Sequence, residues 1–406
     1  MSQIRRTEPE RKVYRPITHP DDLIRHLQWA LCVEVSTIPP YLCALYSIVD
    51  RGSDAAALVR SVVIEEMLHT ALVSNLSNAI GGRPSLAPHL VPLYPGYIPH
   101  HAAGGPFIQL QALSPALARS VFMAIEQPEA SPRSPAEGNH FQTIGQFYKA
   151  IEEGFENCFE RDRDLFKHDT GLQRSDTYFG GGGGELVVAH DLASAKRAIT
   201  EITEQGEGAP QARPPLPGQE RFGDLDNYGT RTDGTYGPIL GTPWELSHYR
   251  KFQQLADGEV PVPETYPMQP NPSSDELDGD LRRLAELFDG CYTLVLLALE
   301  RSFTTPATEA SFFGAAFPVM QSVLPPLATL LMQTPIERKA DPDFGPNAGP
   351  GFAHRKRTVP ELVAEAEHLL AHPPDLGTDY GQAWAGALQA TLDELRAVGA
   401  QEAAAT

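Results

Sequence analysis

Two long helical patterns joined by a very short connection constrain the fold of this chain more than any other feature. From Asp21 to about Asp50, apolar residues recur at steps of three and four, as in a helix with one buried face. A second such pattern covers Ser53 to Ile80, and Gly81-Gly82 closes it as a helix stop. Because Arg51-Gly52-Ser53 forms the connection, the two helices must be an antiparallel hairpin.

The rest of the chain alternates helical patterns with irregular segments. The 37 prolines and 34 glycines exceed average usage, and they gather at Pro84–Pro115 and Gly206–Pro243, where a substrate pocket or lid would be built. A short strand is expected at Glu185–Val188. Further helices are expected at Ala116–Gln127, Phe141–Phe159, Asp191–Gln205, Trp244–Ala256, Glu276–Phe303, Phe312–Met332, Val359–Ala371 and Tyr380–Val398. The pattern predicts an all-α chain.

The composition argues against two classes of partner. Acidic residues outnumber basic ones by 52 to 32, for a formal net charge of −20, and such a surface repels nucleic-acid phosphates and anionic lipid headgroups. No stretch reads as the ~20 apolar residues of a membrane span. The four cysteines form no Cys-x-x-Cys pair, so a reducing cytoplasm fits them best. We expect a cytoplasmic protein with a small-molecule substrate and no nucleic-acid or membrane partner; the oligomeric state stays open, a dimer included.

Candidate metal-binding residues occur on the second helix, in the run Glu65-Glu66-Met67-Leu68-His69. At about 100° per residue, Glu66 falls in the middle of the apolar arc and His69 lies about 60° from it. Both side chains therefore point into the core, whereas Glu65, about 100° from Glu66, is expected at the rim. A buried carboxylate beside a buried imidazole is costly unless something pairs with them, and metal coordination supplies that pairing.

The same Glu-x-x-His spacing recurs at Glu245 and His248, again on the apolar side of a helix. The first helix adds Glu34, which is 18 residues before Gly52, while Glu66 is 14 residues after it. At a rise of about 1.5 Å per residue, these two carboxylates lie at similar heights. One Glu from each of two helices and Glu-x-x-His from each of two others is the ligand set of a carboxylate-bridged di-metal bundle. These donors suit iron or manganese.

The fourth carboxylate is not decided by spacing alone. Glu207, just before the connection to the last ligand-bearing helix, is the first choice, at about 80° from the apolar mean if helical geometry persists. Glu152 shares a side with apolar residues of its own helix and is the rival, and Glu204 is the third option. The predicted metal ligands are Glu34, Glu66, His69, Glu207, Glu245 and His248.

Two local features have more than one interpretation. Pro39-Pro40 falls one turn after Glu34 inside an otherwise helical pattern; the bend that prolines cause either opens space beside the metals or is a packing kink. Gly180 to Gly184 is a run of five glycines without the Lys-Ser/Thr ending of a phosphate-binding loop. We interpret that run as a flexible turn.

Five stretches, taken in this order, carry a family resemblance. They are Glu34-Val35-Ser36-Thr37-Ile38-Pro39-Pro40-Tyr41-Leu42, Ile64-Glu65-Glu66-Met67-Leu68-His69, Thr143-Ile144-Gly145-Gln146-Phe147-Tyr148, Glu204-Gln205-Gly206-Glu207-Gly208 and Glu245-Leu246-Ser247-His248-Tyr249. On these residues the chain resembles the ferritin-like family that includes the iminophenyl-pyruvate dimer synthase domain of violacein- and rebeccamycin-type pathways. Pathway enzymes of this type are longer, and family members often have an acid where Gln146 stands.

The resemblance implies a ferritin-like four-helix bundle with long irregular insertions, followed by a C-terminal helical region. We expect the metal-binding bundle over residues 17–258, a proline-rich linker over 259–274 and a C-terminal helical domain over 275–400. The resemblance also implies oxidative chemistry, since the pathway enzymes couple two imines of an aryl pyruvate.

The leading functional prediction is a non-haem di-iron oxidase or oxygenase that binds two iron ions, with manganese as the alternative, and uses dioxygen as co-substrate. Its substrate would be a small organic molecule, with oxidative coupling of imines or amino-acid-derived molecules in secondary metabolism as the reaction in view. Two other classes stay open. One is a ferritin-like protein that binds or stores iron, and the other is a non-catalytic partner within a biosynthetic cluster.

Overall fold

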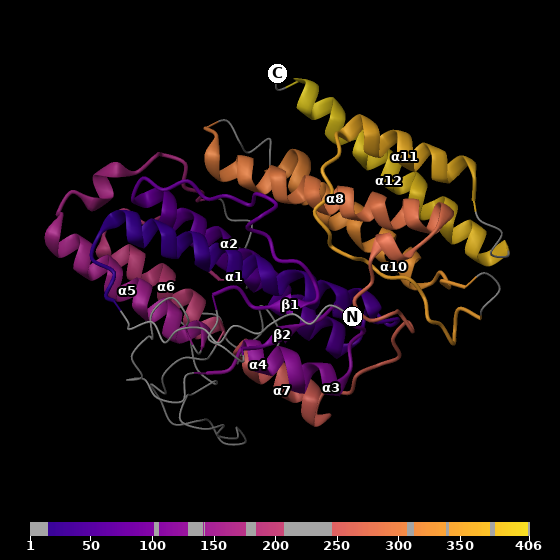
Figure 1. Ribbon diagram of the computed structural model, residues 1–406, viewed down its shortest axis with the longest axis horizontal. Coiled ribbons are helices and arrows are strands. Elements are labelled where there is room, and N and C mark those ends of the chain that lie inside the picture. Colours follow the sequence, from indigo (N-terminus) through magenta and orange to yellow (C-terminus); the bar gives the residue numbers. More distant parts are fainter. Residues whose placement is uncertain are drawn as a thin grey trace, which may run out of the picture.

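A computed structural model describes residues 15–100, 105–128, 141, 143–175, 184–206, 246–306, 312–337, 341–373 and 378–404 of the chain. Its centre is an antiparallel pair of long helices, α1 (Pro20–Ser47) and α2 (Asp54–Ala79), drawn in indigo in Figure 1. The side chain of Ser53 starts α2 by accepting a hydrogen bond from the Ala56 amide. The hairpin expected from the short connection is present.

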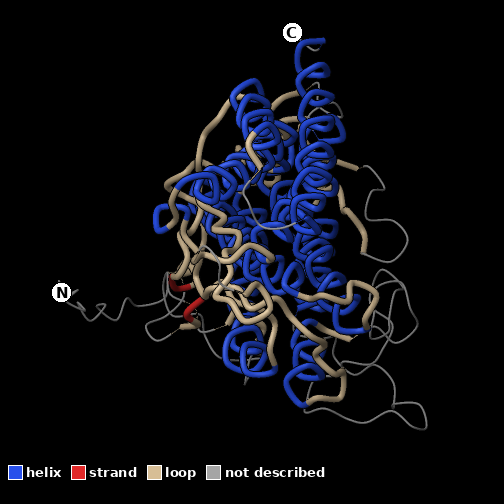
Figure 2. The backbone as a smooth tube through the Cα atoms, turned by 90° about the vertical axis from the view of Figure 1, so that its right-hand side faces the viewer, coloured by secondary structure: helices blue, strands red, loops and turns tan. Residues whose placement is uncertain are grey.

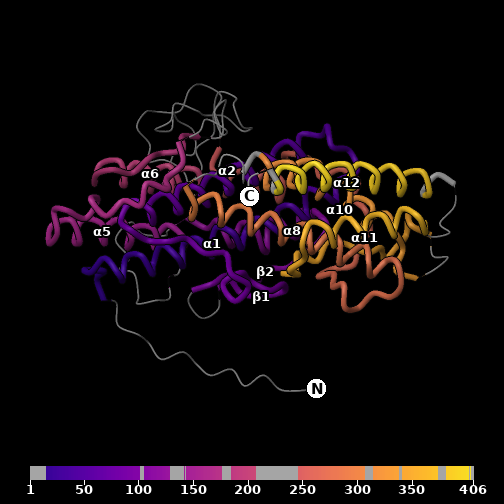
Figure 3. Tube along the Cα trace, turned by 90° about the horizontal axis from the view of Figure 1, so that it is seen from above, coloured from indigo at the N-terminus to yellow at the C-terminus, as the bar shows by residue number. Residues whose placement is uncertain are grey.

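Shorter helices complete a bundle around this pair. Figures 1 and 3 show α5 and α6 lying together at one end of α1 and α2, and α7 lies beside α3 and α4 in Figure 1. The chain passes through α3, a π-helical stretch η1 and α4 without a break. The bounds are α3 Pro115–Leu117, η1 Ala118–Phe122, α4 Met123–Ile125, α5 Ile144–Arg161, η2 Leu165–His168, α6 Leu192–Gly206 and α7 His248–Asp257.

The C-terminal helices pack along the hairpin: α10 contacts α1, and α8 contacts α2, where the side chain of Asn78 donates to the Phe303 carbonyl at 2.9 Å (Figure 1). Residues 259–274 run along the end of α1, with the Val49 amide donating to the Glu264 carbonyl at 3.0 Å. The bounds are η3 Ser274–Glu276, α8 Gly279–Thr304, η4 Phe312–Ala316, η5 Val319–Val323, α10 Leu324–Met332, α11 Val359–Ala371 and α12 Thr378–Ala404. Figure 2 shows how far helices dominate the described chain.

The helix α1 continues through Pro39 and Pro40, both buried. Because Pro40 has no amide hydrogen, the carbonyl of Ser36 loses its helical donor. The hydroxyl of Tyr94 replaces that donor at 2.8 Å. The segment after α2 therefore helps to hold the helix that carries Glu34.

Some expectations for the secondary structure were wrong. Described residues Gly184–Ala189 form no strand, and the carbonyl of Val187 instead accepts from the side chain of Asn75 at 2.9 Å. A two-residue antiparallel pair, β1 (Gly96–Tyr97) with β2 (Phe107–Ile108), is too short to leave a periodic signal.

One helix contradicts the expectation that no stretch could span a membrane. Gly314–Met332 is long and apolar enough by length and composition, with a mean hydropathy of 1.4, although 61% of it is buried inside the protein. Its α10 part packs against α8 and α12, as a core helix does.

Asp289 of α8 is a fully buried carboxylate whose charge state affects stability. It accepts hydrogen bonds from the Ala353 amide at 3.1 Å and the Ser274 hydroxyl at 3.0 Å. Burial nevertheless raises its pKa to about 7, from about 4 in an unfolded chain. The folded state therefore binds the proton of the Asp289 carboxyl more tightly than the unfolded state does. Protonation of Asp289 thus stabilises the fold, fully below about pH 4, and this contribution is lost as pH rises through about 7.

Asp289→Asn removes this titration because an amide does not ionise. The free energy of unfolding of the variant, relative to the unmodified protein, should rise by up to about 4 kcal/mol between pH 4 and pH 8. Urea unfolding at both pH values measures this difference. Parallel pH dependences for the two proteins would contradict the assignment.

Candidate metal centre

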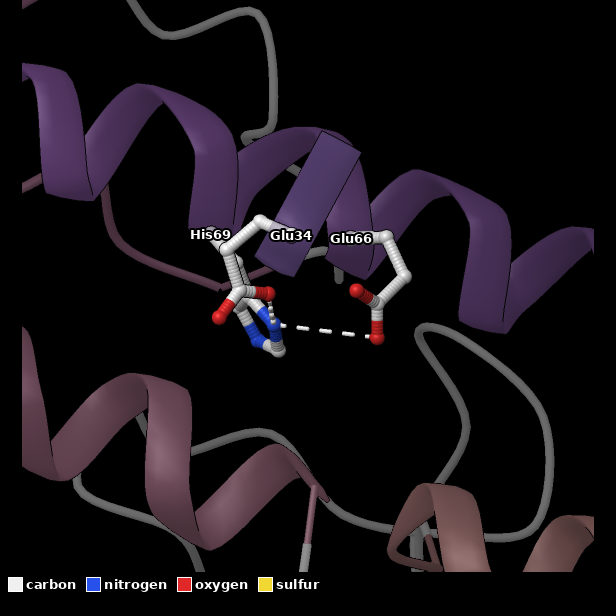
Figure 4. A group of neighbouring side chains, drawn as sticks. All are labelled: Glu34, Glu66 and His69. Carbon is white, nitrogen blue, oxygen red and sulfur yellow. Dashed lines mark ion pairs between the residues drawn. The ribbon is translucent and has the colours of Figure 1, made fainter. Parts of the chain in front are cut away.

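Glu34 from α1 and the pair Glu66 and His69 from α2 converge on one point inside the bundle (Figure 4). Each of the three is only 2% exposed. The Nδ1 atom of His69 is 3.3 Å from Oε2 of Glu34 and 3.8 Å from Oε1 of Glu66. These three residues are called the His69 group below.

A second group shares Glu66 with the first. His248, the first residue of α7, has its Nδ1 atom 2.9 Å from Oε1 of Glu66 and 3.6 Å from Oε2 of Glu126. Glu126 directly follows α4 and is 5% exposed. The rings of His69 and His248 are stacked with centroids 5.4 Å apart. Glu66, Glu126 and His248 are called the His248 group, and in each group the potential ligand atoms lie within 4.8 Å of one another.

Each of the three carboxylates has one oxygen held by a hydroxyl group, while its other oxygen faces a histidine. Thr37 donates to Oε2 of Glu66 at 2.7 Å, and Tyr41 donates to Oε1 of Glu126 at 2.6 Å.

Glu34 follows the same rule, because Tyr148 of α5 donates to its Oε1 atom. Both tyrosines are fully buried. The three oxygens left over are those that face Nδ1 of the histidines, so the hydroxyl groups orient the carboxylates toward a common centre.

The outer nitrogen of His69 bonds to the side chain of Gln205, with Nε2 of His69 2.8 Å from Oε1 of Gln205. The amide orientation follows from Glu201, whose carboxylate can only accept and which lies 2.7 Å from Nε2 of Gln205. The Nε2 atom of His69 must therefore carry a proton, so in the neutral ring, the form that binds a metal, the lone pair lies on Nδ1.

Nε2 of His248 lies 3.1 Å from Oε2 of Glu65, a fully buried carboxylate that also accepts from the ammonium of Lys251 at 2.6 Å. This histidine too donates from Nε2, so in the neutral rings the Nδ1 atoms of both histidines are the nitrogens that face the centre as ligands. Carboxylate or carbonyl support of the second ring nitrogen is the usual arrangement around metal-bound histidine.

The donor set fits metal cations on a second ground. The Nδ1 atom of His248 is buried and makes no hydrogen bond to a described residue, although two carboxylate oxygens lie nearby. Burial and the charge of Glu126 raise the pKa of Glu66 to about 7. Burial lowers the pKa of His248, but Glu126, Glu65 and Glu66 outweigh it and raise that pKa well above its ordinary value. Clustered buried negative charge of this kind is relieved by a cation.

The structure brings together four of the six residues that the sequence predicts as ligands: Glu34, Glu66, His69 and His248. Glu207 and Glu245 lie outside the described residues. The rival Glu152 belongs to neither group, and its carboxylate lies 3.5 Å from the ammonium of Lys196 in a partly exposed pair. Glu204 belongs to neither group as well.

Sequence reasoning missed Glu126 and misplaced Glu65. Glu126 has no histidine at a diagnostic spacing, and its signal was its position four residues after the buried Phe122, on the same helical face. The expectation that Glu65 lies at the rim is wrong, because α2 is enclosed by neighbouring helices on nearly every side. Lys251 makes this burial tolerable by pairing with Glu65.

Comparisons with known proteins agree with this architecture. The chain belongs to the ferritin-like family, whose model matches residues 27–257. A ferritin-like protein from Caulobacter vibrioides has the same fold, with a TM-score of 0.51 over 75% of this chain and 95% of its own, at 23% identity.

A relative of known activity is similar over most of the chain. Dichlorochromopyrrolate synthase from Lentzea aerocolonigenes is 26% identical over 83% of this chain and 36% of its own length, so the chain spans about a third of that protein. The predicted all-α ferritin-like fold and the family resemblance are confirmed.

The shared position of Glu66 predicts how metal content responds to substitution. Glu66→Ala should reduce bound Mn²⁺ from two per chain to less than one, because both groups lose a ligand. Glu126→Ala should keep one ion, in the His69 group. Metal analysis after equilibrium dialysis gives the stoichiometry.

Glu152→Ala is the matched control, since it removes a carboxylate of the same kind that pairs with Lys196 outside both groups. It should keep two ions. Full metal content in Glu66→Ala, or loss in Glu152→Ala, would refute the assignment.

Proposed function

We propose that the protein is a non-haem di-iron oxidase or oxygenase that uses dioxygen to oxidise a small organic substrate, with manganese as the alternative metal. The observation that carries the proposal is the shared carboxylate of Glu66, which lies between the His69 group and the His248 group. A carboxylate common to two histidine-containing groups is the ligand pattern of di-metal carboxylate bundles.

In this proposal Glu34 and His69 would hold one ion, Glu126 and His248 would hold the other, and Glu66 would serve both positions. Glu126 is proposed in place of Glu207 as the carboxylate from the third helix, because its Oε2 atom faces Nδ1 of His248. Two irons held there would supply the binding and reduction of dioxygen. Glu245, one turn before His248, stays a proposed ligand on its spacing alone.

The surrounding side chains keep the centre dry and the carboxylates oriented. The rings of Tyr41, Phe122 and Phe252 pack with centroids 4.8 to 4.9 Å apart beside Glu126, and all three are fully buried. Burial and the nearby carboxylates raise the pKa of both Tyr41 and Tyr148 well above its ordinary value. Both phenols therefore keep their protons at neutral pH and continue to donate to Glu126 and Glu34.

The proposed reaction class follows from the relative rather than from the geometry. Dichlorochromopyrrolate synthase is named for making a chromopyrrolate, and the similarity covers most of this chain. We propose oxidative coupling of imines or other amino-acid-derived molecules in secondary metabolism. An iron-storage role is the less favoured alternative, because irregular segments and the C-terminal helices α8, α10, α11 and α12 enlarge the chain well beyond a simple bundle.

Oxygen uptake after anaerobic loading with Fe²⁺ tests the proposal. The reduced, loaded protein should consume dioxygen, and Glu66→Ala should lower the rate at least tenfold because both metal positions depend on it. Glu152→Ala should leave the rate unchanged. An oxygen electrode gives the rate.

Two outcomes would overturn the proposal. Tightly bound iron without oxygen uptake would indicate a non-catalytic partner protein. A multisubunit cage in size-exclusion chromatography, together with uptake of many iron ions per chain, would indicate storage.

A further inference from the structure

The two histidines of the centre are supported by different chemistry. His248 donates to the carboxylate of Glu65, whereas His69 donates to the side-chain amide of Gln205. The two groups thus offer similar potential ligands to a metal, one histidine and two carboxylates each, but the partners at Nε2 of the two histidines differ.

The support of His248 is an ion pair with no exposure to solvent. Oε2 of Glu65 lies 2.6 Å from the ammonium of Lys251 and 3.1 Å from Nε2 of His248, and all three residues are fully buried. Lys251 lies three residues after His248 on α7, so one helix turn brings both donors to the same oxygen. The ammonium of Lys251 thus lies directly against this buried carboxylate, on the side opposite the metal-facing nitrogen of His248.

The support of His69 is a neutral amide held in one orientation. Gln205 donates to Glu201 one turn earlier on α6, which turns its oxygen toward His69. Gly184 covers this pair with φ of +105°, and a Cβ atom there would collide with the side chains of both Gln205 and Glu201. Only glycine allows the chain to pass so close, which gives the last residue of the glycine run a structural role.

A carboxylate accepts a stronger hydrogen bond from imidazole than an amide does, and it makes the opposite ring nitrogen a better metal donor. We propose that the two metal positions are inequivalent: the His248 position, supported by Glu65 and Lys251, takes the first metal ion, and the His69 position, supported by Gln205, takes the second. Glu65 and Lys251 are positioning residues that act through His248. This inference rests on the proposed di-metal function.

Single-position variants test the order of binding, with Mn²⁺ as the probe and the free ion measured by its EPR signal. His69→Ala leaves the His248 position, and His248→Ala leaves the His69 position. We expect His69→Ala to bind Mn²⁺ at least tenfold more tightly than His248→Ala.

Glu65→Gln, which turns the support of His248 into an amide, should weaken binding about 10- to 100-fold in the His69→Ala background. It should change nothing in the His248→Ala background, where the ring it supports is gone. A purely structural role of Glu65 would weaken both backgrounds alike.

The reciprocal exchange, Glu201→Gln with Gln205→Glu, brings a carboxylate directly against His69 at constant net charge. In the His248→Ala background it should tighten Mn²⁺ binding about tenfold, and it keeps the inference testable if Glu65→Gln does not fold. Thermal unfolding monitors the fold of every variant.

Two results separate failure of the inference from failure of the proposed function. Equal affinities at the two positions, or an equal effect of Glu65→Gln in both backgrounds, would overturn the inference. If the unmodified chain still binds two ions, the proposed di-metal centre is unaffected by that result. An unmodified chain that binds no Mn²⁺ and no Fe²⁺ would overturn both.

Discussion

The side chain of Glu66 is a carboxylate buried between two imidazoles, and groups from three helices converge on it: Thr37 of α1, His69 of α2 and His248 of α7. Its pKa is raised to about 7 by burial and by Glu126, so leaving it ionised costs free energy unless positive charge or hydrogen bonds surround it. Thr37 supplies one bond from α1, and His248 approaches from α7. Contacts with the Glu66 carboxylate therefore join α1, α2 and α7, in addition to the packing of their apolar side chains.

Sequence periodicity could locate the part of the centre that lies on the hairpin. Glu34, Glu66 and His69 belong to two helices joined by a short turn, so helical phase and residue counts determine both direction and height. For Glu126, periodicity could indicate only a buried helical face and not its role as a ligand, because its approach to His248 depends on how distant segments pack. Glu65 was wrongly expected at the rim, because the helical-phase argument assumes that one face of the helix is exposed to solvent, and α2 has almost no exposed face.

The irregular insertion after α2 is part of the scaffold that holds the ligand helix. The carbonyl freed by Pro40 accepts from Tyr94, and Ser85 and Gln28 exchange hydrogen bonds between their backbone and side-chain groups. Residues that periodicity classifies only as loop thus hold α1 at two points, Gln28 and Ser36. This explains how a helix with two internal prolines can still present Glu34 in a definite place.

The unequal support of the two histidines follows from the helix geometry of α2. Glu65 and Glu66 are adjacent, so their side chains diverge by about 100°, and they reach opposite nitrogens of the one ring of His248, at 3.1 Å and 2.9 Å. His69 lies on the same helix as this pair, with its Nε2 atom turned toward α6, where Gln205 meets it. Two adjacent carboxylates on one helix can contact both nitrogens of an imidazole on a facing helix, but they cannot do so for an imidazole on their own helix. The run Glu65-Glu66 followed by His69 therefore already implies that His248 and His69 are supported differently.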